Sequence, residues 1–171
     1  NLATPEDIGS YAARRALARL GSRRISTRKS PVLFDAPIAA SLLGSFVQAI
    51  SGSSLYKNLT FLDNSLDTMI FPESICIEEN PFLIGEMGSA PFDDEGVKVR
   101  PRLVVENGVI KGYFLSSYSA KRLNMHTTGN AGGSHNLRMF DTTSHTGNNL
   151  DEMFKVMGNG LFVTELMGQG V

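Results

Sequence analysis

The sequence of 171 residues contains a single cysteine, Cys76, and no hydrophobic run long enough to cross a membrane. One cysteine excludes an internal disulfide and cannot form a zinc site by itself, which is typical of proteins of the reducing cytoplasm. The longest apolar stretch, around residues 36–43, is far shorter than the roughly 20 residues that a bilayer-spanning helix needs. No charged segment followed by an apolar one opens the chain, so a signal peptide is not indicated. We therefore expect a cytoplasmic protein without a membrane segment.

Strong net charge is also missing, because 16 basic residues nearly balance 17 acidic ones. The basic residues are unevenly placed: residues 14–29 contain seven of them and no acid, which leaves nine against seventeen in the remainder. This basic segment predicts either a solvated helix face and loop or a surface for an acidic partner. Nucleic-acid binders usually add aromatic or glycine-rich elements to such charge, and this segment has neither, so direct nucleic-acid binding is not expected.

The usual motifs of metal, nucleotide and serine-hydrolase sites are absent. His126, His135 and His145 are nine and ten residues apart and match no zinc-ligand spacing, although they could still converge in space. The glycine-rich segment 127–133 lacks the lysine of a phosphate-binding loop, and no G-x-S-x-G turn is present. This segment predicts a close-packed loop or the lining of a peptide site. Cys76 lies in an alternating strand pattern and is expected in the core.

Three acidic side chains are grouped in one turn, Asp93-Asp94-Glu95-Gly96. Neighbouring residues of a turn point apart, and a calcium loop wants acids at alternate positions, so we expect these acids to cap the turn. A metal site that combines them with the three histidines is the alternative.

Periodicity and turn chemistry predict the elements. The clearest is a hairpin over residues 103–115, because Asn107-Gly108 joins two apolar runs and suits a type I′ turn. We also expect helices over 4–20, 37–50 and 149–157, a short buried strand over 31–34, and strands over 74–78 and 161–166. Residues 51–57 and most of the segment after residue 127 are expected as loops. The predicted class is α+β, with a mostly antiparallel β-sheet or barrel-like core and a few flanking helices.

Several segments together resemble one family. They are Arg23-Arg24-Ile25, Pro31-Val32-Leu33-Phe34, Ser41-Leu42-Leu43-Gly44, Ala90-Pro91-Phe92-Asp93-Asp94-Glu95-Gly96, Val105-Glu106-Asn107-Gly108, Thr128-Gly129-Asn130-Ala131, and the run from Gly160 to Val171. In order and wording they resemble the C-terminal domain of the PmbA/TldD family, in its PmbA (TldE) branch, along nearly all of residues 1–171. The chain starts without methionine and stops directly after a predicted strand, so we expect a fragment of a longer chain.

This resemblance implies a function. The family is known as a modulator of DNA gyrase and as a TldD/TldE heterodimeric metalloprotease that degrades unfolded peptides, trims an antitoxin and matures a peptide microcin. In the TldD branch a helix carries His-Glu-x-x-x-His, which supplies two metal ligands and a glutamate that activates water. The matching stretch here is Ser41-Leu42-Leu43-Gly44-Ser45-Phe46, which has neither ligand nor base. The resemblance therefore implies no cofactor in this chain and zinc or a similar divalent metal in a TldD-like partner.

We accordingly expect a non-catalytic metalloprotease subunit that pairs with a TldD-like subunit, or with itself, and presents unfolded peptides. Glycine- and serine-rich segments suit recognition by strand addition, so the candidate peptide-binding residues are Ser51, Gly52, Ser53, Ser54, Thr128, Gly129 and Asn130. Leu42, Leu43 and Phe46 are the candidate interface residues, and no catalytic or metal residue is assigned. Two alternatives stay open: a regulatory protein that modulates DNA gyrase through residues 14–29, and an autonomous hydrolase that uses His126, His135, His145 and the acids at 93–95.

Overall fold

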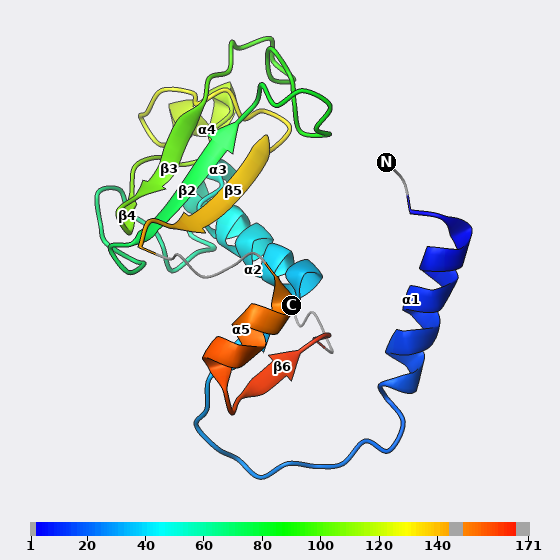
Figure 1. Cartoon of the computed structure of the whole chain (residues 1–171). Helices are drawn as coiled ribbons and strands as arrows, with labels where there is room; N and C mark the ends of the chain where they lie inside the picture. Colours follow the sequence, from blue (N-terminus) through cyan, green and yellow to red (C-terminus); the bar gives the residue numbers. More distant parts are fainter. Residues whose placement is uncertain (1–2, 144–148, 167–171) are drawn as a thin grey trace. The chain divides into compact units, whose positions relative to one another are not determined.

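The structure, a computed structural model, describes residues 3–143 and 149–166, which fall into two compact units, Asn1–Pro31 and Val32–Val171. The first unit contains one helix, α1 (Pro5–Leu17), drawn in dark blue in Figure 1. Thr4 caps this helix, because its hydroxyl accepts a hydrogen bond from the backbone N–H of Asp7 at 3.2 Å. The predicted helix to Leu20 is three residues too long, since the chain turns after Leu17. No residue of α1 is buried.

The second unit is built on a four-stranded antiparallel sheet with the order β4-β3-β2-β5. Its strands are β2 (Ile75–Asn80), β3 (Arg102–Glu106), β4 (Val109–Ile110) and β5 (Asn136–Asp141). The α+β class with mostly antiparallel pairing is therefore confirmed. The barrel-like alternative is wrong for the described residues, because this sheet stays open at β4 and at β5.

A second, smaller sheet lies at the end of helix α2 (Ala36–Ala49) that points away from the four-stranded sheet (Figure 1). It pairs β1 (Val32–Phe34) with β6 (Leu161–Val163) in parallel, and α5 (Leu150–Met157) packs against it through Phe154 and Phe162, whose ring centroids are 5.0 Å apart. The strand predicted over 31–34 exists, but it is not buried, since Val32 and Phe34 are exposed. The helix predicted to begin after Asn149 is confirmed.

The hairpin predicted from Asn107-Gly108 is present between β3 and β4. Both turn residues have positive φ, 48° for Asn107 and 78° for Gly108, as a type I′ turn requires. The turn is also tied to β2, because the backbone N–H of Gly108 donates to the carbonyl of Ile75 at 2.8 Å. The carbonyls of Phe71 and Pro72 leave no room for a side chain at residue 108.

Helix α2 (Ala36–Ala49) covers the core and matches the predicted helix within one residue at each end. Its side chains Leu43 and Phe46 pack against the buried cluster, and the rings of Phe46 and Phe71 lie 5.2 Å apart. Leu42 is exposed. The buried cluster itself combines apolar side chains from the sheet and its connections, among them Ile50, Leu55, Ile77, Val104, Val105, Ile110 and Leu115. No helix in the described ranges is long and apolar enough to cross a bilayer.

Two predicted loops contain regular elements, and one segment without a prediction forms a helix. Residues 51–57 contain α3 (Gly52–Tyr56), because Ser51 caps it and Leu55 anchors it in the core. A further short helix, α4 (Ser117–Arg122), starts after the capping residue Ser116. Residues 136–141 form β5, which pairs with β2 along its full length. A capping serine and burial stabilise these helices, and pairing with the distant strand β2 stabilises β5. These contributions outweigh the low helix and strand propensity of the polar segments.

Candidate functional site

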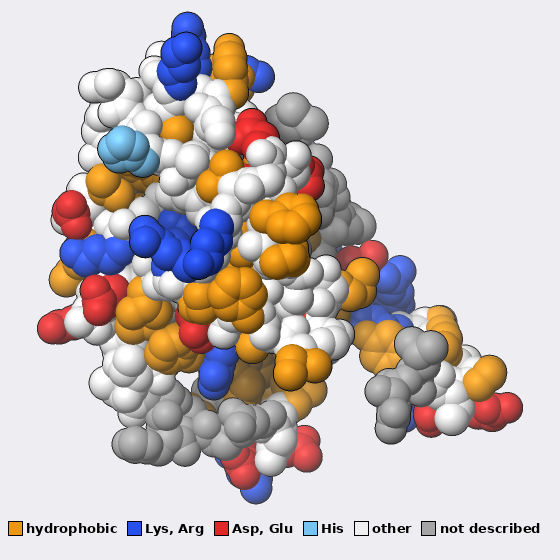
Figure 2. Space-filling model, turned by 90° about the horizontal axis from the view of Figure 1, so that it is seen from above, with side chains coloured by type: hydrophobic (Ala, Val, Ile, Leu, Met, Phe, Trp, Pro, Cys, Tyr) orange, Lys and Arg blue, Asp and Glu red, His pale blue; other side chains and the backbone are white. Residues whose placement is uncertain are grey.

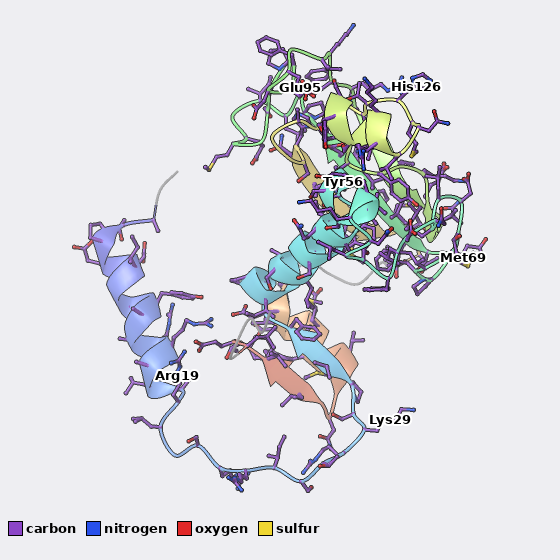
Figure 3. The ribbon with its side chains drawn as sticks, turned by 180° about the vertical axis from the view of Figure 1, so that it is seen from behind. Arg19, Lys29, Tyr56, Met69, Glu95 and His126 are labelled. Carbon is purple, nitrogen blue, oxygen red and sulfur yellow. The ribbon has the colours of Figure 1, made fainter. Side chains whose placement is uncertain are left out.

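A groove with a volume of about 370 Å³ brings together the two segments expected to bind a peptide. Ser51, Gly52 and Ser53 line it from the start of α3, and the loop Asn130–Ser134 lines it from the other side. Tyr56, labelled on α3 in Figure 3, contributes an aromatic wall together with Tyr118, with ring centroids 5.7 Å apart. Residues about 80 positions apart in the sequence thus meet at one surface.

The remaining predicted residues lie nearby but not in the groove. Ser54 is buried under it, where its hydroxyl accepts a hydrogen bond from Gln48 Nε2 at 3.2 Å. Thr128 and Gly129 line a second cavity. Four of the seven predicted residues, Ser51, Gly52, Ser53 and Asn130, therefore line the groove itself.

The α3 side of the groove is held by close backbone packing. The backbone N–H of Gly52 donates to the carbonyl of Phe114 at 2.8 Å, and that of Phe114 donates to Ile50 at 3.2 Å. A side chain at residue 52 would collide with Ser119 of α4. Glycine is therefore required here because two chain segments approach too closely for a Cβ atom.

The loop side of the groove is held from below by a buried carboxylate, Glu79, which is 2% exposed. Its Oε1 accepts hydrogen bonds from Asn130 Nδ2 at 2.7 Å and from the backbone N–H of His135 at 2.9 Å. Its Oε2 accepts from Arg102 Nε at 2.7 Å, and Arg102 also donates to Asn130 Oδ1 at 3.1 Å. This network joins β2 and β3 to both ends of the loop.

Asp93 supports the middle of the same loop. Its Oδ2 accepts a hydrogen bond from the backbone N–H of Ala131 at 3.0 Å, while its Oδ1 accepts from Glu95 and Val97, both at 2.9 Å. The predicted capping role of this turn is therefore observed, and its Glu95, labelled in Figure 3, accepts from the backbone N–H of Ser117 at 2.7 Å. The carboxylate of Asp94 lies beside Gly132 and would have to move for a Cβ to fit there.

Both supporting carboxyls are held in the charged form. Burial alone would raise the pKa of Glu79, but the positive charge of Arg102 and the hydrogen bonds from His135 and Arg102 outweigh it, so this pKa lies below its usual value. Burial would likewise raise the pKa of Asp93, yet the backbone hydrogen bonds from Ala131, Val97 and Glu95 bring it below its usual value. The loop is therefore held by charge-assisted hydrogen bonds at neutral pH.

Among the described residues, those that line the groove are uncharged: none of them is Asp, Glu, Lys, Arg, His or Cys. The hydroxyls of Ser51 and Ser53 lie 3.1 Å from each other, and no lining side chain can act as their general base. The groove therefore offers backbone and hydroxyl groups for binding and no acid–base pair for catalysis.

The second cavity, of about 680 Å³, has a different character and was missed from the sequence. Four basic residues line it, Lys98, Arg100, Arg102 and Lys111, and none of the lining residues that the structure describes is acidic. The first three occupy alternate positions, the spacing that places side chains on one side of an extended chain. The pattern K-x-R-x-R over residues 98–102 is the signal that could have found this site.

The stretch of α2 that matches the metal-binding helix of the TldD branch carries no metal ligand. The segment 41–46 lies on α2, where Ser41 Oγ donates to the carbonyl of Ile38 at 2.7 Å and Ser45 Oγ to that of Ser41 at 3.1 Å. These residues offer no imidazole, thiolate or carboxylate, so they do not fit a divalent metal. Across residues 3–143 and 149–166, no group of three His, Cys, Asp or Glu side chains could hold a metal ion.

The two described histidines, His126 and His135, lie in different surroundings. His126 is exposed on the loop after α4 (Figure 3), whereas His135 Nδ1 lies 3.0 Å from Glu79 Oε1, and His145 falls outside the described residues. Cys76 is buried in β2, as predicted. The histidines that are described thus take different roles, one on the surface and one in the buried network.

Comparison with known proteins identifies the family. Residues 27–171 match the family model of the PmbA/TldA metallopeptidase C-terminal domain. The metalloprotease PmbA of Escherichia coli O157:H7 is 46% identical over 171 residues, and the PmbA homologue of Haemophilus influenzae is 41% identical over 170. These alignments cover 100% and 99% of this chain but 37% of each relative, so the chain spans little more than a third of their length.

Solved structures of similar proteins support the same family assignment. A protein of Bacteroides thetaiotaomicron described as a modulator of DNA gyrase superimposes with a TM-score of 0.84 at 30% identity, over 94% of this chain and 35% of that one. TldE from Thermococcus kodakarensis superimposes with a TM-score of 0.75 at 25% identity, over 95% of this chain and 38% of that one. The chain therefore belongs to the PmbA/TldD family and matches its C-terminal domain.

Proposed function

We propose that this chain is the peptide-presenting part of a non-catalytic subunit in a cytoplasmic TldD/TldE-type metalloprotease. In this proposal the groove between α3 and the loop 130–134 binds an extended, unfolded peptide. A TldD-like subunit supplies zinc or a similar divalent metal and cleaves the peptide. The family membership makes a metalloprotease complex the first assembly to test, and the uncharged groove makes binding the first role to test.

The observation that carries the proposal is the free backbone of the loop. Within the described residues, the N–H groups of Gly132 and Ser134 make no hydrogen bond, although their neighbours Ala131, Gly133 and His135 all do. These N–H groups belong to a turn, with φ of 97° at Gly132 and 126° at Gly133, and they are hydrogen-bond donors available to a ligand. An extended peptide can accept both hydrogen bonds through its own carbonyls, whatever its side chains.

The test of function uses the full-length protein, alone and mixed with a TldD-like subunit. We expect cleavage of an unfolded peptide, and bound metal, in the mixture and neither in this protein alone. Cleavage and stoichiometric metal in the protein alone would contradict the proposal and would favour the autonomous hydrolase.

The test of the groove uses Ser53→Tyr, which places a bulky side chain at an exposed lining position. We expect cleavage by the mixture to fall at least tenfold, mainly through a higher KM, because the peptide is displaced. Ser45→Tyr is the matched control, since Ser45 is exposed on α2 and does not line the groove. Equal loss in both variants would overturn the assignment of the groove.

Interface and regulatory roles are also proposals. Leu42 is exposed and available to a partner subunit or a second copy, whereas Leu43 and Phe46 already pack in the core.

Modulation of DNA gyrase is the second candidate function, favoured by the description of the Bacteroides thetaiotaomicron relative and by the exposed basic residues of 14–29. Gyrase binding that weakens steeply with salt, without any effect on peptide cleavage, would favour this candidate.

A further inference from the structure

We propose that the basic cavity, the one lined by Lys98, Arg100, Arg102 and Lys111, binds the carboxylate of a peptide's C-terminal residue. The cavity is separate from the groove and belongs to no metal site. The choice of a peptide as the ligand rests on the proposed function, while the choice of a carboxylate rests on the charges described below.

The positive charge of the cavity is only partly neutralised. Arg102 is paired with buried Glu79, and Lys111 Nζ lies 3.0 Å from Asp67, whose side chain is 72% exposed. Lys98 and Arg100 have no ion-pair partner among the described residues. Lys98 and Arg100 therefore leave this concave wall with uncompensated positive charge, which favours an anion beside them.

Arg102 positions the cavity rather than serving as its free cation. Its Nε and two terminal nitrogens donate to Glu79, to the carbonyl of Tyr113 at 3.0 Å and to Asn130, and its guanidinium lies 5.1 Å from the ring centre of Phe114. Lys98 and Arg100 flank buried Val99 in the chain segment that leads into β3. The two free cations are therefore attached to a segment that the core fixes on one side.

The rest of the lining decides which anion fits. Leu66, Val99, Leu103 and Met125 provide apolar surface, and Thr127 and Thr128 provide hydroxyls. This combination suits a carboxylate attached to a hydrophobic side chain better than bare phosphate, which has no apolar part. A volume of about 680 Å³ is enough for one or two amino-acid residues, within the range of about 300–1,000 Å³ typical of ligand pockets.

Nucleic acid fits the cavity less well. A phosphate backbone needs a track of cations along a surface and aromatic side chains for stacking, whereas these cations surround one cavity. Tyr113 is its only aromatic lining residue within the described chain, and its hydroxyl accepts a hydrogen bond from the backbone N–H of Leu66 at 2.9 Å. On the face drawn in Figure 2, Lys and Arg side chains lie beside hydrophobic and acidic ones.

The experiment measures binding of labelled peptides to the full-length protein by fluorescence anisotropy. One peptide ends in leucine with a free carboxylate, a second ends in leucinamide, and a third carries an internal glutamate and an amidated end. We expect the free acid to bind at least tenfold more tightly than the amide, and this advantage to shrink as salt is raised. Equal binding of acid and amide would overturn the inference, and equal binding of the glutamate peptide and the free acid would overturn its assignment to a C-terminus.

Charge variants separate the cavity from general electrostatics. We expect the double variant Lys98→Gln/Arg100→Gln to weaken binding of the free acid about tenfold or more and to leave the amide unchanged. The control Arg23→Gln/Arg24→Gln removes the same charge from an exposed segment of the first unit, outside the cavity and the groove, and should leave both peptides unchanged. Equal losses in the two variants, or tighter binding of single-stranded DNA than of the free acid, would contradict the inference. Survival of amide binding in all variants would leave the groove proposal intact, so the two proposals fail separately.

Discussion

Glu79 shows how one side chain can organise a binding loop. It comes from the centre of the sheet, yet its hydrogen bonds reach Arg102 on β3 and Asn130 and His135 at the two ends of the loop. In the described structure, every buried polar side-chain atom has a hydrogen-bond partner. Loss of this carboxylate would leave several of these partners unsatisfied.

The variant Glu79→Gln should therefore lower the free energy of unfolding by about 3 kcal/mol, because it leaves the Arg102 charge buried without its counterion. Urea denaturation measures this change. Asp67→Asn is the control, since it removes an exposed partner of Lys111 and should cost less than about 1 kcal/mol. Equal losses would mean that burial does not decide how much the Glu79–Arg102 and Asp67–Lys111 ion pairs contribute to the free energy of unfolding.

A pH dependence follows from the same carboxyls. Glu79 and Asp93 have pKa values in the folded chain below their usual values of 4.5 and 3.8. Such groups stabilise the fold above the unfolded-state pKa, and this contribution is lost as the pH falls through the folded-state pKa. We expect the free energy of unfolding to decrease as the pH falls below 4.5, with a smaller decrease in Glu79→Gln. An unchanged decrease in that variant would assign the effect to other acids.

At the scale of elements, the hairpin turn depends on crowding as well as on φ. Gly108 and Gly85 have nearly equal φ, 78° and 80°, but a Cβ at Gly108 would meet the carbonyls of Phe71 and Pro72, whereas nothing lies within 4 Å of one at Gly85. The pair therefore separates the cost of backbone strain from that of steric overlap.

We predict that Gly85→Ala costs about 1 kcal/mol, from positive φ alone. Gly108→Ala should cost about 2 kcal/mol more, because the backbone of the neighbouring loop must move. Thermal unfolding of the two variants tests this difference. Equal midpoints would show that the loop around Phe71 yields freely and that only φ matters.

At the scale of the whole molecule, the two units differ in what stabilises them. Helix α1 buries none of its residues within its own unit, while α2 packs on the core of the other. An isolated helix of 13 residues is marginal in water. We predict that a peptide of residues 1–31 shows weak helical circular dichroism at 222 nm in water and gains helix in trifluoroethanol. Full helicity in water would mean that capping by Thr4 and local charge suffice.

The sequence alone determined the features that depend on near neighbours. These are helix α2, the Asn107-Gly108 hairpin, the caps at Thr4 and Asn149 and the α+β class, because periodicity, turn chemistry and capping act over a few residues. It also indicated the serine- and glycine-rich segments of the groove. Tertiary structure decided which distant residues act together. Helix α3 forms because Leu55 is buried, and β5 forms because it pairs with β2. The basic cavity forms because Lys98 and Arg100 come to lie beside Lys111 and the segment 125–129. Burial, pairing and charge proximity arise only in three dimensions, so no local pattern reveals them fully.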